Sequence, residues 1–340
     1  MDRRTFLDRL ALLGGLLPLN AAAGISVPGK EEGGEILTDL GFLPGGIPSD
    51  TTGIRRLSAE KNFLLYHAKL APAYTVKPGE IVLVECRHGL PGLVTRDGQF
   101  KEPGPKDPIN PATGPIFVEG IEPGDALAID FLEIRPGDWG YCDRHIFELK
   151  NGFVQLDERI KLLLQPMIGG VGIAPAQGTM DTKTPAETGG NMDCREVRAG
   201  STLAFTAQAL GALVGMGDAH ALQGDGEICG QGIETDAEVL VRFRKLPHPL
   251  SPRPVIVRAE WVATLAAHPD LSEAAWQATD DMVKLLAQKS DIEEKVSRWM
   301  VNFLGQLRIN QIVDPAKGAR MEMPAWTFGI GKNRQAKDSF

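Results

Sequence analysis

Nucleic acid is not an expected partner, because the sequence has neither a surplus of basic residues nor many aromatic ones. The 340 residues carry a formal net charge of -8, and the pI is about 5.4. A protein that binds the phosphate backbone usually presents a basic patch or stripe. Aromatic residues make up 6% of the chain, so a stacking platform for single strands is not expected either.

Several cofactor motifs are also missing. The four cysteines are Cys86, Cys142, Cys194 and Cys229. No two of them form a Cys-x-x-Cys pair, so we expect buried free thiols rather than a thiolate zinc site. The glycines between Pro166 and Pro175 resemble a dinucleotide fingerprint, but the third glycine is missing and a proline follows. A Rossmann domain is therefore not indicated.

The apolar run from Leu10 to Leu19 is too short to cross a bilayer. It follows Arg3-Arg4 and precedes Ala21-Ala-Ala23, which has the pattern of a cleavage site. This predicts a twin-arginine-type signal peptide over residues 1–23, and hence a periplasmic protein with no membrane association after its removal. A cytoplasmic protein with a helical N-terminal extension is the alternative.

Turn residues are abundant, with 39 glycines and 24 prolines, which favours many short strands over a helical bundle. A Pro-Gly turn recurs at 77–80, 122–125 and 135–138. Proline followed by glycine is typical of a type II turn, and the first two precede strand-like runs. Thr202 to Val214 is expected to be one further apolar strand. The pattern predicts a β-meander or sandwich, because no helix-length segment lies between these strands.

The character of the chain changes after the proline-rich link at 247–254. We predict a β-sandwich catalytic region over residues 24–250 and a smaller C-terminal α+β region over 251–340 that packs on it. One apolar stripe there comprises Ile292, Val296, Trp299, Met300, Phe303, Leu304 and Leu307. Its three- and four-residue spacing predicts a helix, with Trp299 and Phe303 in the core.

The run Gly215–Glu227 holds Asp218, His220, Asp225 and Glu227 without any lysine or arginine. Its four glycines disfavour a helix. A strand would place Asp218 and His220 on one face, and the following glycines would turn the chain so that Glu227 begins a return strand. Carboxylates and an imidazole at one edge suit a divalent cation, zinc first, with calcium or magnesium as alternatives that prefer more oxygen ligands. A solvated polar hairpin tip is the simpler alternative.

A Gly-Gly loop carries Asn191 and Asp193 two residues apart, so an extended chain would place them on one face. The apolar segment 202–214 then leads directly into Asp218. We therefore expect Asp193 to neighbour the Asp218–Glu227 run.

Several segments together resemble the acetamidase/formamidase family. They are Pro78–Glu80, Asn110–Pro115, Val118–Gly120, Glu122–Asp125, Pro166–Gly169, Gly172, Ala174-Pro175, Gly189–Asp193 and Gly217–Glu227. The resemblance covers most of the chain after residue 23. It implies a mainly β fold, a jelly-roll-like β-sandwich with a smaller C-terminal α+β portion. It also implies a metal-dependent hydrolase of small linear amides that assembles as a homo-oligomer.

With that chemistry in view, we expect Asp193, Asp218 and His220 to hold the metal ion. Glu227 is either a further ligand or the general base that moves protons. Asp225 is expected to orient His220 from behind.

Substrate contacts are expected from three other residues. Asn191 would hydrogen-bond the amide or its oxyanion, and Glu119 would hold the amide NH2 group. His88 lies where the family has an acidic turn, so it is either a substitute polar group at the site or a surface residue.

Three alternatives remain at this stage. Cys194 could form an acyl-enzyme instead of a metal-activated attack. The departure at His88 and the export signal also fit a hydrolase of a larger or cyclic amide. An exported β-sandwich with an acidic loop could also bind a metal ion or a carbohydrate without turnover.

Overall fold

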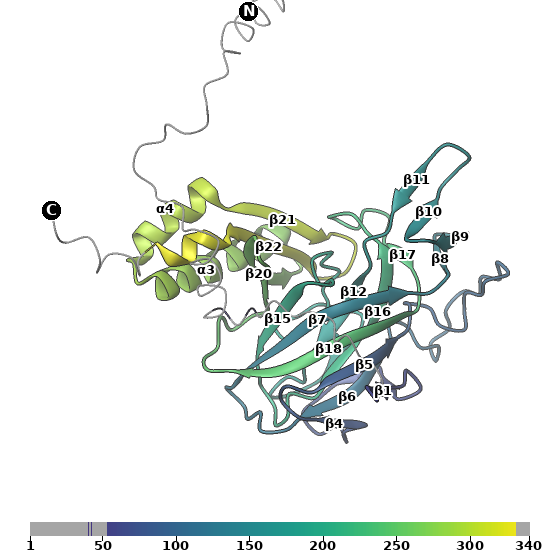
Figure 1. The fold of residues 1–340 in the computed structure, drawn as a ribbon, viewed down its shortest axis with the longest axis horizontal. Coiled ribbons are helices and arrows are strands. Elements are labelled where there is room, and N and C mark those ends of the chain that lie inside the picture. The colour runs from purple at the N-terminus through teal and green to yellow at the C-terminus, as the bar shows by residue number, and fades with distance from the viewer. Residues whose placement is uncertain (1–39, 41, 43–52, 331–340) are drawn as a thin grey trace, which may run out of the picture.

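The computed structural model describes Leu40, Phe42 and residues 53–330. The predicted export signal lies outside the described residues. Most of the chain forms two large β-sheets, with two α-helices near the C-terminus (Figure 1). Neither of the described helices is long and apolar enough to cross a membrane.

The first sheet has nine strands. In spatial order they are β1 (Arg55–Leu57), β5 (Ile81–Cys86), β18 (Ala237–Leu246), β7 (Ala126–Pro136), β15 (Ser201–Thr206), β19 (Val255–Val257), β20 (Trp261–His268), β22 (Lys317–Pro324) and β21 (Gln306–Gln311). The last four strands come from the C-terminal part of the chain. The boundary drawn at residue 250 therefore falls inside one continuous sheet.

The second sheet has eleven strands, and β16 is at its centre. Its main path is β11 (Lys161–Leu163), β10 (Phe153–Gln155), β9 (His145–Lys150), β8 (Trp139–Cys142), β17 (Ile233–Glu234), β16 (Val214–Leu222), β12 (Met167–Gly172) and β14 (Gly189–Asn191). Strand β6 (Ala112–Val118) also pairs with β16, and β2 (Asn62–Phe63) and β4 (Tyr74–Val76) pair with β6. A separate pair joins β3 (Leu65–Tyr66) to β13 (Met180–Asp181).

The core of the sandwich lies between the two sheets. Buried side chains from both sheets join one hydrophobic cluster, among them Val84 and Val239 from the first and Ile168 and Ile116 from the second. Strand β5 alternates strictly between buried and half-buried residues, as a strand with one face on the core should. The expectation of a mainly β sandwich is confirmed.

The helices α3 (Leu271–Ser290) and α4 (Glu294–Leu304), with the short 3-10 helix Ala325–Gly329, pack beside the C-terminal strands (Figure 1). They enclose a second hydrophobic cluster that includes Met282 and Leu286 of α3, Val301 of α4 and Met323 of β22. The arm formed by β10 and β11 projects at the opposite end of the molecule (Figure 1).

The prediction that Trp299 and Phe303 are core residues was wrong. Trp299 is 51% exposed and Phe303 75% exposed. The inward face of α4 is instead formed by Ser297 and Val301, and the hydroxyl of Ser297 donates a hydrogen bond to the Val283 carbonyl oxygen of α3. Helical periodicity located α4, although Ile292 precedes the helix and Leu307 lies in β21, and it could not tell which face of the helix turns inward.

Two strand expectations also need correction. The segment from Thr202 to Val214 is not one strand, because β15 ends at Thr206 and β16 begins at Val214 in the other sheet. Gly79 and Gly124 have positive φ directly before β5 and β7, as the Pro-Gly turns predict. The third Pro-Gly does not turn in this way, since Pro136 still belongs to β7.

Candidate active site

The candidate site lies where β16 runs between β12 and β17. His220 is paired in register with Met167 of β12 and with Glu234 of β17. Asp218 lies two residues earlier on β16, and its carboxylate is 3.6 Å from Nε2 of His220. The prediction that Asp218 and His220 share one face is confirmed. The return strand, however, begins at Ile233 rather than at Glu227, so the acidic residue opposite His220 is Glu234.

Carboxylates crowd around Nε2 of His220. Glu234 Oε1 lies 3.0 Å from this nitrogen, while Glu234 Oε2 accepts a hydrogen bond from the backbone N–H of Gly89. The opposite ring nitrogen, Nδ1, lies 2.7 Å from Oε1 of Gln223. The amide nitrogen of Gln223 donates to the Asp193 carbonyl oxygen, so its oxygen must face Nδ1 and accept the proton carried there. Nε2 is then the nitrogen left to bind a cation.

A second chain of hydrogen bonds holds the carboxylate of Asp193. The amide nitrogen of Asn191 donates to Asp193 Oδ2 at 2.7 Å and to Asp314 Oδ2 at 3.0 Å. The amide oxygen of Asn191 accepts a hydrogen bond from Asn110. Both N–H groups of Asn191 are thus used to orient carboxylates, and neither is free to contact an amide oxyanion.

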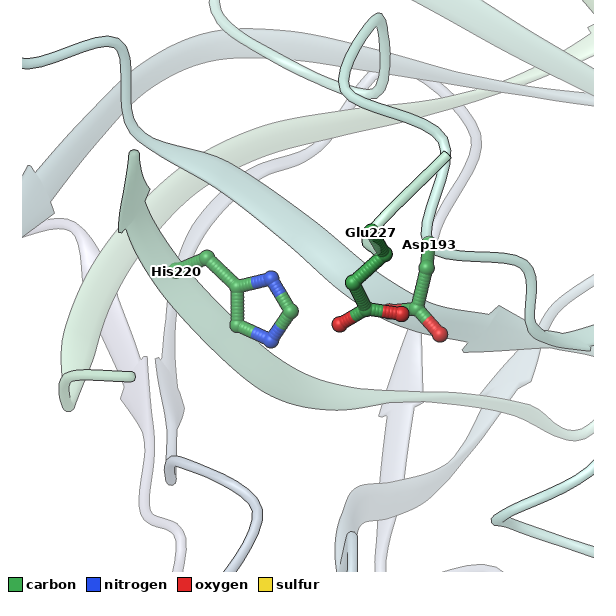
Figure 2. A group of neighbouring side chains, drawn as sticks. All are labelled: Asp193, His220 and Glu227. Atoms are coloured by element: carbon green, nitrogen blue, oxygen red, sulfur yellow. The ribbon is translucent and has the colours of Figure 1, made fainter. Parts of the chain in front are cut away.

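Glu227 reaches the same cluster from a loop rather than from a strand. Ligand atoms of Asp193, His220 and Glu227 all lie within 4.8 Å of one another, and Figure 2 shows the two carboxylates side by side, facing the ring of His220. Two backbone hydrogen bonds fix this loop to the end of β21. The N–H of Gly226 donates to the carbonyl oxygen of Asn310, and the carbonyl oxygen of Gly226 accepts from the N–H of Ile312.

Asp225 holds this loop from its other side. Its two carboxylate oxygens accept bonds of 2.8 and 2.9 Å from the guanidinium of Arg320. Arg320 is itself buried and also donates to Glu322. The expectation that Asp225 orients His220 is not met, since Gln223 contacts the imidazole instead.

Four residues of the site have positive φ although none is glycine. They are Asn110 (47°), Asp193 (44°), Asp218 (58°) and Glu227 (44°). Such conformations cost on the order of 1–3 kcal/mol each and persist only where the surroundings impose them. Their concentration here indicates that side-chain placement at this cluster takes precedence over local backbone preference.

Glycine is required where the backbone passes under the carboxylates. A Cβ on Gly169 would lie 2.4 Å from Asp193 Oδ1 and 2.6 Å from Asp218 Oδ2. The backbone at this residue can approach the two carboxylates because glycine has no side chain.

The electrostatics of the cluster are dominated by burial and mutual repulsion of the acids. Burial, together with Asp218 and Glu234, raises the pKa of Glu227 to about 8. Burial and the neighbouring Glu227 raise the pKa of Asp193 well above its usual value. Burial alone would lower the pKa of His220, but the carboxylates of Glu234 and Asp218 outweigh it, so the net pKa is raised well above normal.

A pocket of about 430 Å³ opens onto these groups. Acidic side chains on its wall are Asp181, Asp218, Glu227, Glu234 and Asp314, and the one basic side chain that lines it, Lys183, is exposed. The buried acids therefore lack a permanent positive partner within the described wall.

The residues present fit a divalent cation. Asp193 Oδ1 and His220 Nε2 are buried, and neither makes a hydrogen bond, because Glu234 Oε1 lies 3.0 Å from Nε2 without hydrogen-bond geometry. A buried polar atom without a partner costs free energy unless something satisfies it. Two overlapping sets of ligand atoms meet at His220, one with Asp193 and Glu227 and one with Asp218 and Glu234. One imidazole nitrogen among carboxylate oxygens is a donor set that zinc accepts.

The structure thus brings together five of the residues predicted from sequence, namely Asn191, Asp193, Asp218, His220 and Glu227. Glu119 is exposed at the end of β6 that lies away from Asn110, so it is not part of the cluster. His88 is buried against Tyr141 and Trp139 and lines a neighbouring pocket with Asp236.

Sequence reasoning missed Glu234, Asp314 and Gln223. Glu234 could have been predicted from the sequence, because a return strand that pairs with β16 must place some residue opposite His220. Asp314 reaches the pocket from a distant loop after β21, and no local pattern marks it.

Sequence comparison gives relatives for part of the chain. The acetamidase of Mycolicibacterium smegmatis is 26% identical over 248 residues, covering 48% of this chain and 61% of that protein. The formamidase of Methylophilus methylotrophus is 24% identical over 241 residues, covering 48% and 59%. The chain therefore spans about three fifths of the length of these curated relatives.

Solved structures match over more of their length. A predicted acetamidase/formamidase from the thermophile Thermoanaerobacter tengcongensis superposes with a TM-score of 0.77 at 31% identity, covering 81% of this chain and 98% of that one. The acetamidase of Bacillus halodurans gives 0.74 at 29% identity, covering 79% and 97%. The sequence profile of the Acetamidase/Formamidase family matches residues 55–168 and 167–248, more than half of the 340 residues. Profile, fold and acidic cluster agree, and the chain belongs to the acetamidase/formamidase family.

Proposed function

We propose that this protein hydrolyses a small linear amide, of the formamide or acetamide kind, to a carboxylate and ammonia in a metal-dependent reaction. The observation that carries the proposal is the buried set of His220 Nε2 and Asp193 Oδ1, neither of which makes a hydrogen bond, with the carboxylates of Glu234 and Asp218 at 3.0 and 3.6 Å from Nε2 and a pocket above them. Family membership and the names of the relatives support the same reaction class.

His220, Asp218 and Asp193 would hold the ion, and Glu234 joins this set because its Oε1 lies beside Nε2. We propose zinc, since a nitrogen ligand among carboxylates favours it over calcium or magnesium. When bound, such an ion supplies a water of lowered pKa and polarises a carbonyl group.

Glu227 suits the proton-transfer role. Its carboxyl group lines the pocket, and it is carried by a loop rather than by the strand that holds His220. A general base works best with a pKa near the working pH, and the pKa of Glu227 is raised towards that range by burial. Glu227 takes the proton of the attacking water and returns it to the leaving nitrogen.

Asn191 and Gln223 would contribute by orienting two of the proposed metal ligands. Asn191 fixes the rotamer of Asp193, and Gln223 fixes the tautomer of His220. Cys194 is a poor nucleophile, because it is buried and burial raises the pKa of its thiol to about 11. Metal-assisted hydrolysis therefore fits the geometry better than an acyl-enzyme on Cys194.

A larger or cyclic amide is the second candidate. The pocket of about 430 Å³ is within the range of sites for much larger ligands than formamide. We also propose that the enzyme is exported to the periplasm and works as a homo-oligomer, as the first 23 residues and the resemblance respectively predict.

The test is ammonia release over a panel of amides that includes formamide, acetamide, longer aliphatic amides and lactams. Wild type is compared with His220→Ala and with His145→Ala, a control histidine that is exposed on β9. We expect ammonia from at least one linear amide, loss in His220→Ala and no change in His145→Ala. Release from lactams alone would favour the second candidate, and no release from any zinc-loaded sample would contradict hydrolysis.

A further inference from the structure

The backbone directly after β5 contacts the strands that carry the proposed metal ligands. The carbonyl oxygen of Arg87 accepts a hydrogen bond from the N–H of Ala219, the residue before His220 on β16. The N–H of Gly89 donates to Glu234 Oε2 at 2.9 Å. The other oxygen of that carboxylate is then the one that faces His220 Nε2. The position of this backbone therefore decides how Glu234 is oriented.

Little space separates Gly89 from the acids. A Cβ on Gly89 would lie 3.1 Å from Asp218 Oδ1 and 3.2 Å from Glu234 Oε2. The carbonyl oxygen of Gly89 also accepts from the N–H of Asn110 at 2.8 Å. Because these contacts are close, a displacement of Gly89 would move the carboxylates of both acids.

His88 anchors the same stretch of backbone from the neighbouring pocket. Its side chain is buried and lines that pocket, whereas Gly89 and Leu90 line the acidic one. The backbone N–H of His88 donates to Asp236 Oδ1 at 3.1 Å. The backbone N–H of Leu90 donates to Nδ1 of the His88 ring at 3.2 Å. The residue thus fixes the chain on both sides of Gly89.

The hydrogen bonds of the His88 ring determine its tautomer. Nδ1 accepts from the Leu90 N–H, and the hydroxyl of Tyr141 lies 3.3 Å from the same nitrogen. Nδ1 therefore carries no proton, and the Tyr141 hydroxyl is the donor in this contact. Burial lowers the pKa of His88 below its ordinary value, which agrees with a neutral ring that carries its proton on Nε2.

Tyr141 connects His88 to the proposed ligands by a second route. It is the residue of β8 that pairs with Glu234 of β17, and it lines the acidic pocket. The rings of His88 and Tyr141 pack edge to face, with their centroids 5.1 Å apart. A single nitrogen of His88 thus binds the backbone next to Gly89 and the tyrosine that pairs with Glu234.

We propose that His88 is a positioning residue for the hydrolysis proposed above, on which this role rests, and that it orients the carboxylate of Glu234. It acts through the two groups that donate to Nδ1, the Leu90 N–H and the Tyr141 hydroxyl. Groups that orient a metal ligand typically contribute to metal affinity or activity. Zinc affinity and turnover should therefore depend on the acceptor at Nδ1 rather than on the bulk of the ring.

Four variants separate hydrogen bonding from packing. His88→Phe keeps an aromatic ring beside Tyr141 but removes the acceptor. His88→Asn gives up the ring but keeps an acceptor near the place of Nδ1, whereas His88→Gln has its amide near the place of Nε2. His268→Phe is the matched control, because Nδ1 of His268 also accepts the N–H of the second residue after it. His268 lies at the end of β20 and does not line the acidic pocket.

Each variant is measured for kcat on the best amide and for zinc affinity by competition with a chromophoric chelator, and circular dichroism verifies folding. We expect His88→Phe and His88→Gln to lose about 10–100-fold in zinc affinity or kcat. We expect His88→Asn to retain most of both, and His268→Phe to match wild type.

Wild-type values in His88→Phe would overturn the proposal. Equal losses in His88→Phe and His88→Asn would overturn it as well, because packing alone explains them. If His88→Phe does not fold, the pair His88→Asn and His88→Gln decides by the same criterion. A wild type that binds zinc but releases no ammonia would contradict the proposed function, and zinc affinity alone would then decide the role of His88. A wild type that binds no zinc would overturn both.

Discussion

Gln223 determines which nitrogen of His220 faces the acids. Its amide oxygen lies 2.7 Å from His220 Nδ1, and its amide nitrogen donates to the Asp193 carbonyl oxygen at 2.7 Å. One side chain therefore connects two of the proposed metal ligands. Sequence could not assign this role, because glutamine three residues after a histidine has no distinctive pattern.

Replacing Gln223 by leucine should weaken metal binding without removing a ligand. Groups that orient a ligating histidine are typically worth about 10–100-fold in metal affinity or activity. We expect a zinc dissociation constant raised by roughly that factor, measured by competition with a chromophoric chelator. Gln231→Leu is the control, since Gln231 lines the same pocket but contacts Asp143. Equal affinities of Gln223→Leu and wild type would refute the role of Gln223.

Gly169→Ala should abolish metal binding while leaving most of the fold intact. The added methyl group would meet both the Asp193 and Asp218 carboxylates, so the two must turn away from His220. Gly224→Ala is the control, because a Cβ there meets nothing within 4 Å and φ is not positive. Bound zinc per chain, measured by mass spectrometry of the metal, should fall only in Gly169→Ala. Full zinc content in that variant would show that these carboxylates are not ligands.

The stability of the metal-free protein should decrease as the pH rises. The pKa of Glu227 is about 8 in the folded chain against an ordinary 4.5, and the pKa values of Asp193 and His220 are raised as well. Folded protein then binds more protons than unfolded protein between about pH 5 and pH 8, so unfolding becomes easier as pH rises. Each shifted pKa unit corresponds to about 1.4 kcal/mol, so we expect a loss on the order of a few kcal/mol.

Urea unfolding at pH 5 and pH 8, in chelator and in excess zinc, tests this dependence. Zinc should remove the loss, because metal binding stabilises the deprotonated acids. Glu227→Gln should reduce the slope in chelator, since the group that titrates is gone. A metal-free protein as stable at pH 8 as at pH 5 would contradict the burial of uncompensated acids.

Asp225→Asn should lower turnover through the loop that carries Glu227. The variant weakens the paired contacts to Arg320 but removes no proposed metal ligand. A displacement of about 1 Å of a catalytic group can cost on the order of 100-fold in rate. We expect kcat to fall by about 10–100-fold with zinc content unchanged, and Asp97→Asn, an exposed turn residue, to behave as wild type. Loss of zinc together with kcat would show instead that Asp225 supports the ligands.

The sequence predicted features that depend on neighbouring residues, and it missed residues that reach the site from distant parts of the chain. Alternation along one strand placed Asp218 and His220 together, and Pro-Gly turns located the starts of β5 and β7. Glu234 was missed because the chain runs through ten residues of loop, 223–232, before β17 begins. Asp314 depends on how β21 meets the 223–232 loop in space. Trp299 was misplaced because periodicity defines a helix face but not its partner.

Turnover is proposed to depend on one metal ion at His220, and a zinc titration of the chelated protein tests this dependence most directly. Ammonia release from the best amide is recorded together with bound zinc per chain. Activity should be absent without metal and rise in proportion to bound zinc, with saturation near one ion per chain. Full ammonia release from the metal-free protein would contradict the account, as would a zinc-saturated, folded protein that hydrolyses no amide.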